Sequence, residues 1–474
     1  MLTKTAEAIA ALAQTRLVGA PEVGIGPDVV IDSRAVTPGC LFVALPGERV
    51  DGHDFAAAAV AGGAAAVLVS RQLTLDVPQL IAKDTAKALA NLAGAVVAER
   101  IGAGLVSVAV TGSSGKTSTK DLIAQVLVQA GATVAPVGSA NNEIGAPLTA
   151  LRVDAETRFL VSELGSRGQG HIKWLCDIVQ PSVGVVTNVG HAHVGEFGSV
   201  EAIATAKAEL VAALPPSGWA ILNADDSLVA SMATRTTAKV AGFGVEAEPG
   251  FGEVRAWATE VRVDDRQRAS FTLQAAGSIQ GRAQVKLQVS GLHQVANSLA
   301  AACVGLTQRL TVAEVADALS TAIAKSHWRM ELLDAPGGLL VVNDSYNANP
   351  DSMAAALRAT AGMRRSGGRL LAVLGDMLEL GPEADEAHHR VGELAGSLGF
   401  DELIVVGDHA EALAAGARAH GSAVRVVGST SAAAEVAATL ARTADVVLVK
   451  ASRGLALESV AQRLAEVAAT ESER

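Results

Sequence analysis

The sequence lacks an excess of positive charge. Lysine and arginine number 38 against 49 aspartate and glutamate residues, which gives a formal net charge of −11. A broad surface for a nucleic-acid backbone needs a basic face, so we expect no nucleic-acid partner. The same deficit means that no long-range field attracts an anionic substrate, and any bound anion must be held by local positive groups.

Cysteine and aromatic side chains are also rare. Aromatic residues make up 3% of the chain, and alanine supplies much of its 50% hydrophobic content. The three cysteines, Cys40, Cys176 and Cys303, are odd in number and widely separated, and no C-x-x-C motif occurs. This pattern fits a reducing compartment, and it predicts three small buried side chains rather than disulfides or a zinc site.

Long apolar segments are missing as well. The most apolar stretch, residues 55–69 (FAAAAVAGGAAAVLV), is too short for a membrane span and consists mainly of alanine and glycine. Residues 1–17 resemble a signal peptide at first sight, but Glu7 interrupts the apolar run, and Thr3 or Thr5 can cap an amphipathic helix. We therefore expect a soluble, cytoplasmic protein that does not insert into a membrane.

The length of 474 residues suggests about three domains. Residues 1–83 mix a helical start with short strands at 40–45 and 65–70. Residues 84–326 begin with a helical pattern and then alternate strand and helix patterns, which is typical of βαβ units around a mostly parallel sheet. Within them, alternating strands at 252–290 predict an antiparallel edge. Residues 327–474 alternate again, which predicts a second doubly wound domain.

The end of the second domain carries a local helix signal. Thr311 and Glu314 have the spacing of a capping box, which predicts a helix from Thr311 to about residue 323.

The clearest chemical signal is residues 108–121, VAVTGSSGKTSTKD, where an apolar strand leads into a glycine turn, a lysine and the hydroxyl residues Thr117 and Ser118. The strict phosphate-loop pattern has a glycine five residues before Gly115. That position holds Val110, and Gly112 lies only three residues ahead. The stretch is therefore either an accidental match or a tighter variant of the loop.

The residue types of this loop favour a nucleotide site. The N–H groups of 112–117 would converge on a phosphate at the positive end of the following helix. Lys116 would reach the terminal phosphates, and the Thr117 hydroxyl can bind Mg²⁺. Glu163, at the end of the strand pattern RFLVSELG, is a candidate for a further oxygen ligand. The bland alternative is a glycine turn with a solvated lysine.

Two other features have open interpretations. His191 and His193 follow a strand pattern and are either metal or acid–base groups or polar surface residues. Lys207 lies in a helix pattern between small alanines, so it is either desolvated and partly neutral or a surface charge whose stem lies along the helix.

Together these residues resemble a known family, the ATP-dependent Mur ligases, over nearly the whole chain. The resemblance rests on motifs that follow one another in family order: DSRAVTPGCLFVALPGERVDGHDF (32–55), TGSSGKTSTKD, SANNEIGAPLTAL (139–151), SELGSRGQGHI (162–172), NVGHAHVGEFGSVE (188–201), GLHQVANSLAA (291–301), HWRME (327–331), NDSYNANPDSM (343–353), LGDMLELG (375–381) and KASRGLALE (450–458). The family uses the shortened T-G-x-x-G-K-T loop, which accounts for Val110. Two positions depart from the family pattern, Ala451 in place of a glycine and Leu457 in place of a methionine.

The resemblance implies an α/β fold with three domains: a small N-terminal UDP-binding domain, a central ATPase domain with a parallel sheet, and a C-terminal Rossmann-like domain that binds the amine substrate. It implies that Lys207 is carbamylated, which gives a carboxylate able to hold a second Mg²⁺, and that Glu163 and His193 are metal-site residues. The implied catalytic residues are Lys116, His193, Lys207 and Arg329. The implied ATP contacts are Thr111, Gly112, Ser113, Ser114, Gly115, Lys116, Thr117, Ser118, Asn297, Arg329 and Asp344. The implied substrate contacts are Ser33, Arg34, Asn141, Asn142, Ser166, Arg167, Tyr346, Asn347 and Asn349.

Within the family, the chain is most similar to members that add D-alanyl-D-alanine to UDP-N-acetylmuramoyl-tripeptide. The implied chemistry is attack of a carboxylate on the γ-phosphate of ATP, followed by displacement of phosphate from the acyl phosphate by an amine. Separate domains for the substrates imply closure about hinges near 84 and 327. The alternatives are a relative that adds a single amino acid, a folylpolyglutamate synthase, or a nucleotide-driven switch. We expect a monomer.

Overall fold

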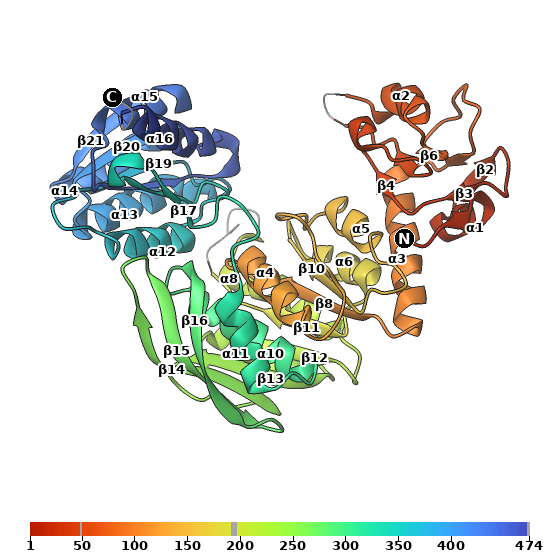
Figure 1. The fold of residues 1–474 in the computed structure, drawn as a ribbon, viewed down its shortest axis with the longest axis horizontal. Helices are drawn as coiled ribbons and strands as arrows, with labels where there is room; N and C mark the ends of the chain where they lie inside the picture. Colours follow the sequence, from red (N-terminus) through yellow and green to blue (C-terminus); the bar gives the residue numbers. More distant parts are fainter. Residues whose placement is uncertain (48–49, 191–196, 472–474) are drawn as a thin grey trace.

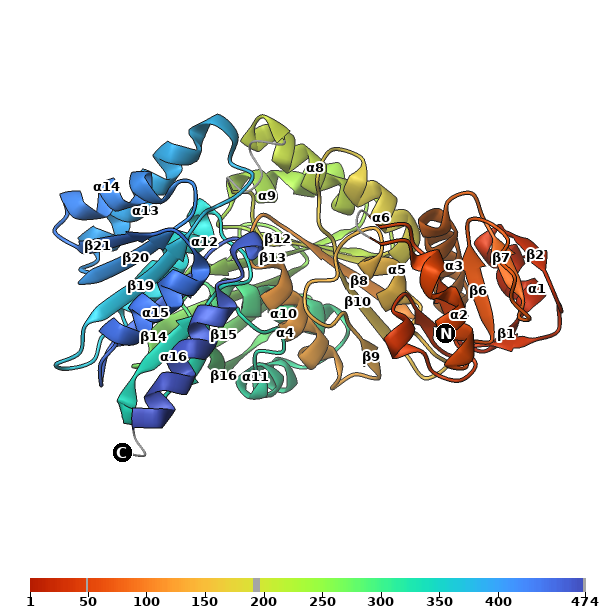
Figure 2. The ribbon, with the colours of Figure 1, turned by 90° about the horizontal axis from the view of Figure 1, so that it is seen from above.

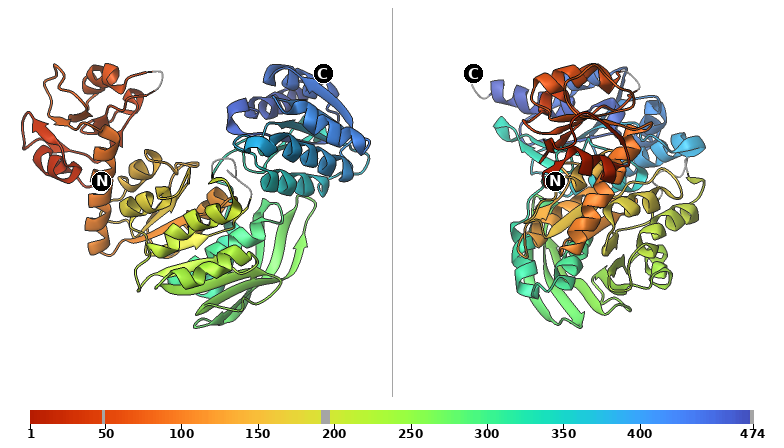
Figure 3. Two further views of the ribbon diagram at one scale, coloured as in Figure 1. Left: turned by 180° about the vertical axis from the view of Figure 1, so that it is seen from behind. Right: turned by 90° about the vertical axis from the view of Figure 1, so that its right-hand side faces the viewer.

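The computed structural model describes residues 1–47, 50–190 and 197–471. Three large sheets, each with its own helices, form three lobes (Figure 1). The N-terminal and C-terminal lobes lie at opposite ends of the central lobe, whether seen from above (Figure 2) or from behind (Figure 3). The expected three-part α/β architecture is confirmed, while the limits at 83/84 and 326/327 stay predictions.

The N-terminal lobe contains a five-stranded sheet in the order β2-β7-β6-β5-β4, in which only the β2–β7 pair is antiparallel. The Thr5 hydroxyl accepts a hydrogen bond from the Ala8 N–H and begins the first helix, as expected. The elements are β1 (Lys4–Thr5), α1 (Ala6–Ala13), β2 (Arg16–Val18), β3 (Gly24–Ile25), β4 (Val29–Val30), β5 (Leu41–Val43), α2 (Ala56–Ala61), β6 (Ala66–Val69) and β7 (Gln79–Ile81).

Helix α3 (Thr85–Gly102) joins the first two lobes. The Asp84 carboxylate caps it by accepting the Lys87 N–H at 2.9 Å. The helix packs against α1 on one side and against α5 (Gly145–Ala150) and α6 (His171–Val179) on the other. One apolar cluster therefore runs from Leu68 in the first sheet through Leu92 to Leu175 in the central lobe. Because this core is continuous, movement of the N-terminal lobe must carry α3 or shear this packing.

The central sheet has nine strands in the order β16-β15-β14-β13-β12-β11-β8-β10-β9. The seven strands from β14 to β9 are parallel, and the two hairpin pairs β14–β15 and β15–β16 form the expected antiparallel edge. The carboxyl ends of the parallel strands meet at one edge, where α/β proteins bind ligands. The strands are β8 (Val106–Thr111), β9 (Thr133–Val134), β10 (Phe159–Glu163), β11 (Val183–Val186), β12 (Trp219–Asn223), β13 (Lys239–Val245), β14 (Val254–Val263), β15 (Arg268–Gly277) and β16 (Gly281–Ser290).

Two helices cover one face of this sheet close to its ligand edge. Helix α10 (Gln294–Thr307) packs against α4 (Lys116–Leu127), and nearly all of its side chains are buried. A helix buried on every side needs small apolar residues, and NSLAAACVG supplies them. The capping box of Thr311 and Glu314 is confirmed, and α11 runs over Val312–Thr321. The remaining helices of the lobe are α8 (Val200–Ala212) and α9 (Ser227–Ser231).

The C-terminal lobe is a six-stranded, doubly wound sheet in the order β17-β18-β22-β19-β20-β21, parallel except for β17. One apolar cluster lies under α12, α13 and α14, and another lies under α15 and α16, so helices cover both faces as expected. The elements are β17 (Glu331–Asp334), β18 (Leu340–Asn343), α12 (Pro350–Ala361), β19 (Leu370–Gly375), α13 (Ala384–Ser397), β20 (Glu402–Val406), α14 (Ala410–Ala419), β21 (Ala423–Val427), α15 (Thr430–Leu440), β22 (Val446–Lys450) and α16 (Glu458–Glu471).

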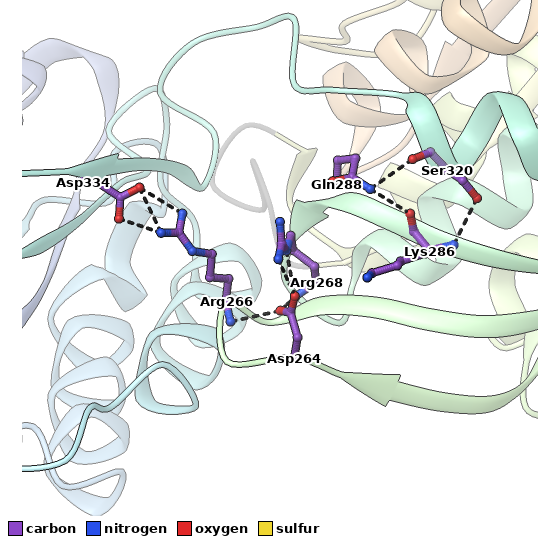
Figure 4. A network of polar contacts seen from close by, with 7 residues as sticks. All are labelled: Asp264, Arg266, Arg268, Lys286, Gln288, Ser320 and Asp334. Atoms are coloured by element: carbon purple, nitrogen blue, oxygen red, sulfur yellow. Dashed lines mark hydrogen bonds and ion pairs between the residues drawn. The ribbon is translucent and has the colours of Figure 1, made fainter.

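The hairpin between β14 and β15 makes a second link between the central and C-terminal lobes (Figure 4). Asp264 braces the tip by accepting the N–H and Nε–H of Arg268. Arg266 then reaches Asp334 of β17 with Nη2 and Oδ1 2.8 Å apart. The Arg266 side chain is 35% exposed and that of Asp334 is 56% exposed, so this solvent-accessible ion pair contributes at most about 1 kcal/mol. Its role is to define where the hairpin meets the C-terminal lobe.

Two expectations from composition can be compared with the structure. All three cysteines are buried free thiols, as predicted. Across the described ranges, no helix combines the length and the apolar character that crossing a bilayer requires.

The close packing of α10 on α4 makes a stability prediction. A Cβ at Gly305 would lie 2.7 Å from Val126 Cγ1 and 2.9 Å from Val315 Cγ2. Alanine favours a helix over glycine by about 1 kcal/mol, whereas overpacking costs about 1–3 kcal/mol. We expect Gly305→Ala to lower the free energy of unfolding by about 1 kcal/mol in urea denaturation. The matched control is Gly102→Ala, where a Cβ meets nothing within 4 Å, and this change should raise stability. A more stable Gly305→Ala protein would contradict the packing argument.

Candidate active site

A cavity of about 520 Å³ lies between the central and C-terminal lobes. The central lobe contributes the glycine loop, the ends of β10, β11 and β12, and the start of α10. The C-terminal lobe contributes the segments after β18 and β22 and the first turns of α12. The linker between the lobes, residues 322–330 between α11 and β17, adds Arg329. Groups from both lobes therefore line one shared cavity.

The glycine loop after β8 needs both of its glycines. Gly112 has φ +153°, and a Cβ there would lie 1.9 Å from Thr187 Oγ1. Gly115 has φ +77°, and its Cβ would lie 2.6 Å from Asn297 Oδ1. Both positions combine an unfavourable backbone conformation for other residues with a close neighbour. The shortened loop is thus fitted to the end of β11 and to α10.

The segment after β11 braces the loop from the side. The Ser113 N–H donates to the Asn188 carbonyl at 3.0 Å, and the Ser114 N–H donates to Asn188 Oδ1 at 2.9 Å. Thr111, at the end of β8, is buried, and its hydroxyl donates to the Leu164 carbonyl at 3.0 Å. Thr111 therefore supports the loop from behind and does not line the cavity, whereas residues 112–118 all do.

Lys116 begins α4 and donates from Nζ to the Gly112 carbonyl at 2.8 Å. Burial lowers the pKa of Lys116, Glu163 opposes this by raising it, and the positive charge of Arg329 lowers it further. Lys116 comes from the central lobe and Arg329 from the linker, and their positive charges repel each other. An anion between them would relieve that repulsion.

Glu163 receives hydrogen bonds on both oxygens. The Thr117 hydroxyl donates to Oε2 at 2.8 Å, and Ser139 and Asn141 donate to Oε1 at 2.9 and 2.8 Å. Thr117 and Glu163 are both 1% exposed, so hydroxyl and carboxylate oxygens meet in a buried position beside the loop. Mg²⁺ takes one or two carboxylates and fills its other positions with water and phosphate oxygens. The pair fits such an ion, although the described residues contain no group of three or more His, Cys, Asp or Glu suited to a metal.

Lys207 lines the same cavity from α8 and is 5% exposed. Burial, and then the charge of Lys116, lower the pKa of Lys207 to about 7. Of the two interpretations left open by the sequence, the structure favours the desolvated, partly neutral lysine. The expected metal residue His193 and its neighbour His191 lie outside the described residues.

Arg329 is held by aromatic rings at the lobe boundary. Its guanidinium lies 4.2 Å from the centre of the Tyr346 ring, and this ring stacks on Trp328, which in turn lies under Arg453. Within the part of the chain that the structure describes, Arg329 Nε is buried without a hydrogen-bond partner. Cation–π contact fixes the arginine side chain while leaving its donors for a ligand.

Asp344 sits between the linker and the end of β22. Its Oδ1 accepts the Met330 N–H at 3.0 Å, and its Oδ2 lies 2.6 Å from Lys450 Nζ. On the central side, His293 at the start of α10 faces this pair. Burial lowers the pKa of His293, Asp344 raises it, and Lys450 lowers it. The Asp344 carboxylate is therefore fixed in position at the point where the two lobes meet.

Comparison with known proteins identifies the family of this chain. The Mur ligase family catalytic domain matches residues 28–99, the Mur ligase middle domain matches 110–305, and the Mur ligase glutamate ligase domain matches 328–453. The UDP-N-acetylmuramoyl-tripeptide–D-alanyl-D-alanine ligase of Mycobacterium tuberculosis is 45% identical, covering 92% of this chain and 91% of that protein. The chain belongs to the Mur ligase family. The Escherichia coli ligase with the same name is 39% identical, covering 92% and 93%.

Solved structures support the Mur ligase assignment along the whole chain. MurF from Acinetobacter baumannii has a TM-score of 0.85 and 30% identity, covering 98% of this chain and 99% of that one. The MurF ligase from Thermotoga maritima in complex with ADP has a TM-score of 0.76 and 28% identity, covering 94% and 98%.

Most of the residues expected to contact substrate line the cavity of this Mur ligase. Asn142 accepts the Gly145 N–H at the start of α5, Asn349 caps α12, and the Asn347 carbonyl accepts Lys450 Nζ at 2.8 Å. Two expected residues lie elsewhere. Ser33 and Arg34 form a short turn in the N-terminal lobe, where exposed Arg34 pairs with Asp32. The expected substrate contacts that line the cavity are Asn141, Asn142, Ser166, Arg167, Tyr346, Asn347 and Asn349. Two expected ATP contacts, Ser118 and Asn297, line it as well.

Sequence reasoning missed several residues that build the site. Asn188, Ser139, His293 and Lys450 all lie inside motifs of the Mur ligase family, yet none was a candidate. Asn188 and Lys450 each open a motif directly after a strand pattern, which is the signal that identified Glu163. The same criterion applied to every strand end finds both of them.

The lowered pKa of Lys207 predicts a pH dependence of stability. In the unfolded chain a lysine has a pKa near 10.5, whereas in the folded protein Lys207 has a pKa of about 7. Between these values the unfolded state binds more protons, so stability rises as pH rises through this window. In CO₂-free buffer we expect wild type to gain up to about 4 kcal/mol over Lys207→Met between pH 7 and 10. Denaturant titrations at each pH measure this difference.

A matched control uses the exposed Lys173 on α6. The stability difference between wild type and Lys173→Met should stay constant over the same pH range. A constant difference for Lys207→Met as well would mean that this lysine keeps an ordinary pKa in the folded state.

Proposed function

We propose that this Mur ligase joins D-alanyl-D-alanine to UDP-N-acetylmuramoyl-tripeptide, with ATP as the activating substrate and ADP and phosphate as products. The observation that carries the choice of substrates is the 45% identity, over 92% of the chain, to a ligase named for them. The similar Thermotoga ligase was solved in complex with ADP, which supports the choice of nucleotide. Because ATP and a UDP-linked precursor are consumed, we expect the reaction in the cytoplasm, and we expect one chain to carry one complete site.

The chemistry requires that two anions meet. A carboxylate oxygen of the tripeptide attacks the γ-phosphorus of ATP, the bond to ADP breaks, and an acyl phosphate forms. The free amine of the dipeptide then attacks the acyl carbon, phosphate leaves, and the ammonium proton is lost to solvent or a base. Lys116 and Arg329 both line the cavity and would offset the repulsion in the first step. Positioned charges of this kind contribute several kcal/mol in a site that excludes water.

The metal would be held on the central side of the cavity. Thr117 and Glu163 offer hydroxyl and carboxylate oxygens, and Lys207 offers a second ligand once its neutral amine has added CO₂ and lost a proton to give a carbamate. The family resemblance adds His193. When bound, Mg²⁺ supplies charge neutralisation and orients the phosphate oxygens. The pKa of Lys207 of about 7 supports this, because only the neutral amine reacts with CO₂.

The remaining substrate contacts are proposed from the position of each residue in the lobes and from the family resemblance. Asn297 and Asp344 would hold the adenosine part of the nucleotide, and Ser33 and Arg34 would hold the uridine diphosphate of the first substrate. Closure about hinges near 84 and 327 would bring the lobes together and keep water from the acyl phosphate. The peptide contacts would come from Asn141, Asn142, Ser166, Arg167, Tyr346, Asn347 and Asn349.

A substrate matrix tests the function. With ATP, Mg²⁺ and UDP-N-acetylmuramoyl-tripeptide present, phosphate release should require D-alanyl-D-alanine, and single amino acids should not replace it. Tripeptide labelled with ¹⁸O in its terminal carboxylate should transfer label to the released phosphate. Lys116→Ala should reduce turnover at least about 10³-fold, because it removes a charge that acts on the transferred phosphate, with an unchanged circular dichroism spectrum. Phosphate release that ignores the dipeptide, or unlabelled phosphate, would refute the proposal.

A second prediction concerns Lys207. Lys207→Ala should lose most activity, and short carboxylates such as acetate or propionate should restore part of it by occupying the place of the carbamate. Mass spectrometry of wild type prepared with ¹³CO₂ should find the added carboxylate on this residue. Full activity of Lys207→Ala without added carboxylate would end the carbamate proposal but leave the ligase proposal intact.

A further inference from the structure

Lys120 is a buried cation that the proposed mechanism does not use. It lies one turn beyond Lys116 in α4, and its side chain is 1% exposed. Its ammonium pairs with the neighbouring carboxylate of Asp121, which is itself 8% exposed. Burying an ion pair is costly unless the remaining hydrogen-bonding groups are satisfied, so the other contacts of Lys120 need an explanation.

Those contacts hold the segment that follows β9. Lys120 Nζ donates to the carbonyls of Pro136 and Gly138, both at 3.0 Å. Residues 136–142 form neither helix nor strand, and β9 before them is only two residues long. Backbone carbonyls in such a segment lack the partners that a helix or sheet would give them. An ammonium with three donors can fix two carbonyls at once and still pair with Asp121.

The same segment positions Glu163. Ser139 lies one residue beyond Gly138, and its hydroxyl donates to Glu163 Oε1 at 2.9 Å. Asn141 donates to the same oxygen at 2.8 Å and to Ser139 Oγ at 3.0 Å. A shift of the backbone at 136–138 would therefore move both donors and release the carboxylate. The Lys120 ammonium is thus connected to the Glu163 carboxylate by hydrogen bonds at both ends of a short backbone segment, residues 136–141.

We propose that Lys120 is a positioning residue for Glu163, which acts by fixing residues 136–141 so that Ser139 and Asn141 orient the carboxylate beside the glycine loop. The proposal rests on the proposed function, because Glu163 matters there as an oxygen ligand for the metal that accompanies the nucleotide. Groups that orient a metal ligand typically change metal affinity by roughly 10–100-fold when removed. Lys120 acts one step further away, so its effect falls at the lower end of this range.

The experiment measures nucleotide binding rather than turnover. Calorimetry follows ADP binding to wild type and Lys120→Met over a series of Mg²⁺ concentrations and in EDTA. We expect the Mg²⁺ concentration for half-maximal enhancement of ADP binding to rise about tenfold. ADP binding in EDTA should stay within about twofold of wild type, because the loop contacts to phosphate remain. The matched control is Lys325→Met. It removes an exposed lysine beside buried Ser326, whose hydroxyl oxygen lies 3.5 Å from Lys120 Nζ, without touching residues 136–141, and it should leave both values unchanged.

Folding defects are separated by two further variants. Lys120→Met leaves Asp121 without its cation, so Lys120→Met/Asp121→Asn removes both charges should the single variant not fold. Ser139→Ala breaks the connection at its other end without touching the buried pair. The Lys120→Met/Ser139→Ala double variant should shift the Mg²⁺ requirement no more than the larger single change, because both act on Glu163 by one route.

The outcomes are distinct. A Mg²⁺ requirement unchanged in folded Lys120 variants, or effects of Lys120 and Ser139 that simply add, would overturn the positioning role. Equal weakening with Mg²⁺ and in EDTA would also overturn it, since this indicates a general structural defect. Wild type that binds no ADP under any condition would instead refute the proposed function.

Discussion

The repulsion between like charges in the shared cavity is the interaction on which this structure depends. Lys116, Lys207 and Arg329 face one space, and burial lowers the pKa of both lysines. In a medium of lower polarity than water, each charge acts strongly on the others. The arrangement favours anions, and the charge of Lys116 adds to the larger effect of burial in lowering the pKa of Lys207. The overall acidity of the chain does not oppose this, because fields at such short range outweigh the net charge.

Because these charges come from different parts of the chain, the distances between them depend on how the lobes are connected. The glycine loop and Lys207 belong to the central lobe, whereas the rings of Tyr346 and Trp328 tie Arg329 to the C-terminal lobe. The backbone of the linker is also bonded to the C-terminal lobe, because the Tyr346 N–H donates a hydrogen bond to the Trp328 carbonyl at 3.2 Å. Any rotation of the C-terminal lobe therefore changes the distance between Arg329 and Lys116. The hairpin contact of Arg266 with Asp334 adds a second, weak contact between the two lobes.

The sequence predicts the parts of the site that depend on local rules. The glycine loop, the strand-end Glu163 and the Thr311 cap follow from residue types at fixed short spacings. It did not predict contacts between distant segments. Asn188 supports Ser114 from 74 residues away, and no periodicity within either segment encodes that contact. Likewise, the alternating pattern at 252–290 indicated strands but not their partners. The parallel pairing of β13 with β14, which joins that edge to the central sheet, depends on packing outside the pattern. The burial of Lys207 depends on such packing too, so the sequence left two alternatives open.

The two departures from the family pattern show how packing decides whether a substitution alters the surface of the cavity. Ala451 and Leu457 belong to the motif at 450–458, which the resemblance links to the amine substrate, yet both are fully buried in the apolar cluster under α15 and α16. A Cβ at Gly375 would lie 2.9 Å from the Ala451 Cβ, so the absence of a side chain at the end of β19 makes room for this methyl group. Lys450, Ser452 and Arg453 beside it still line the cavity. The methyl group of Ala451 is therefore accommodated inside the C-terminal lobe, and the polar side chains next to it remain at the cavity surface.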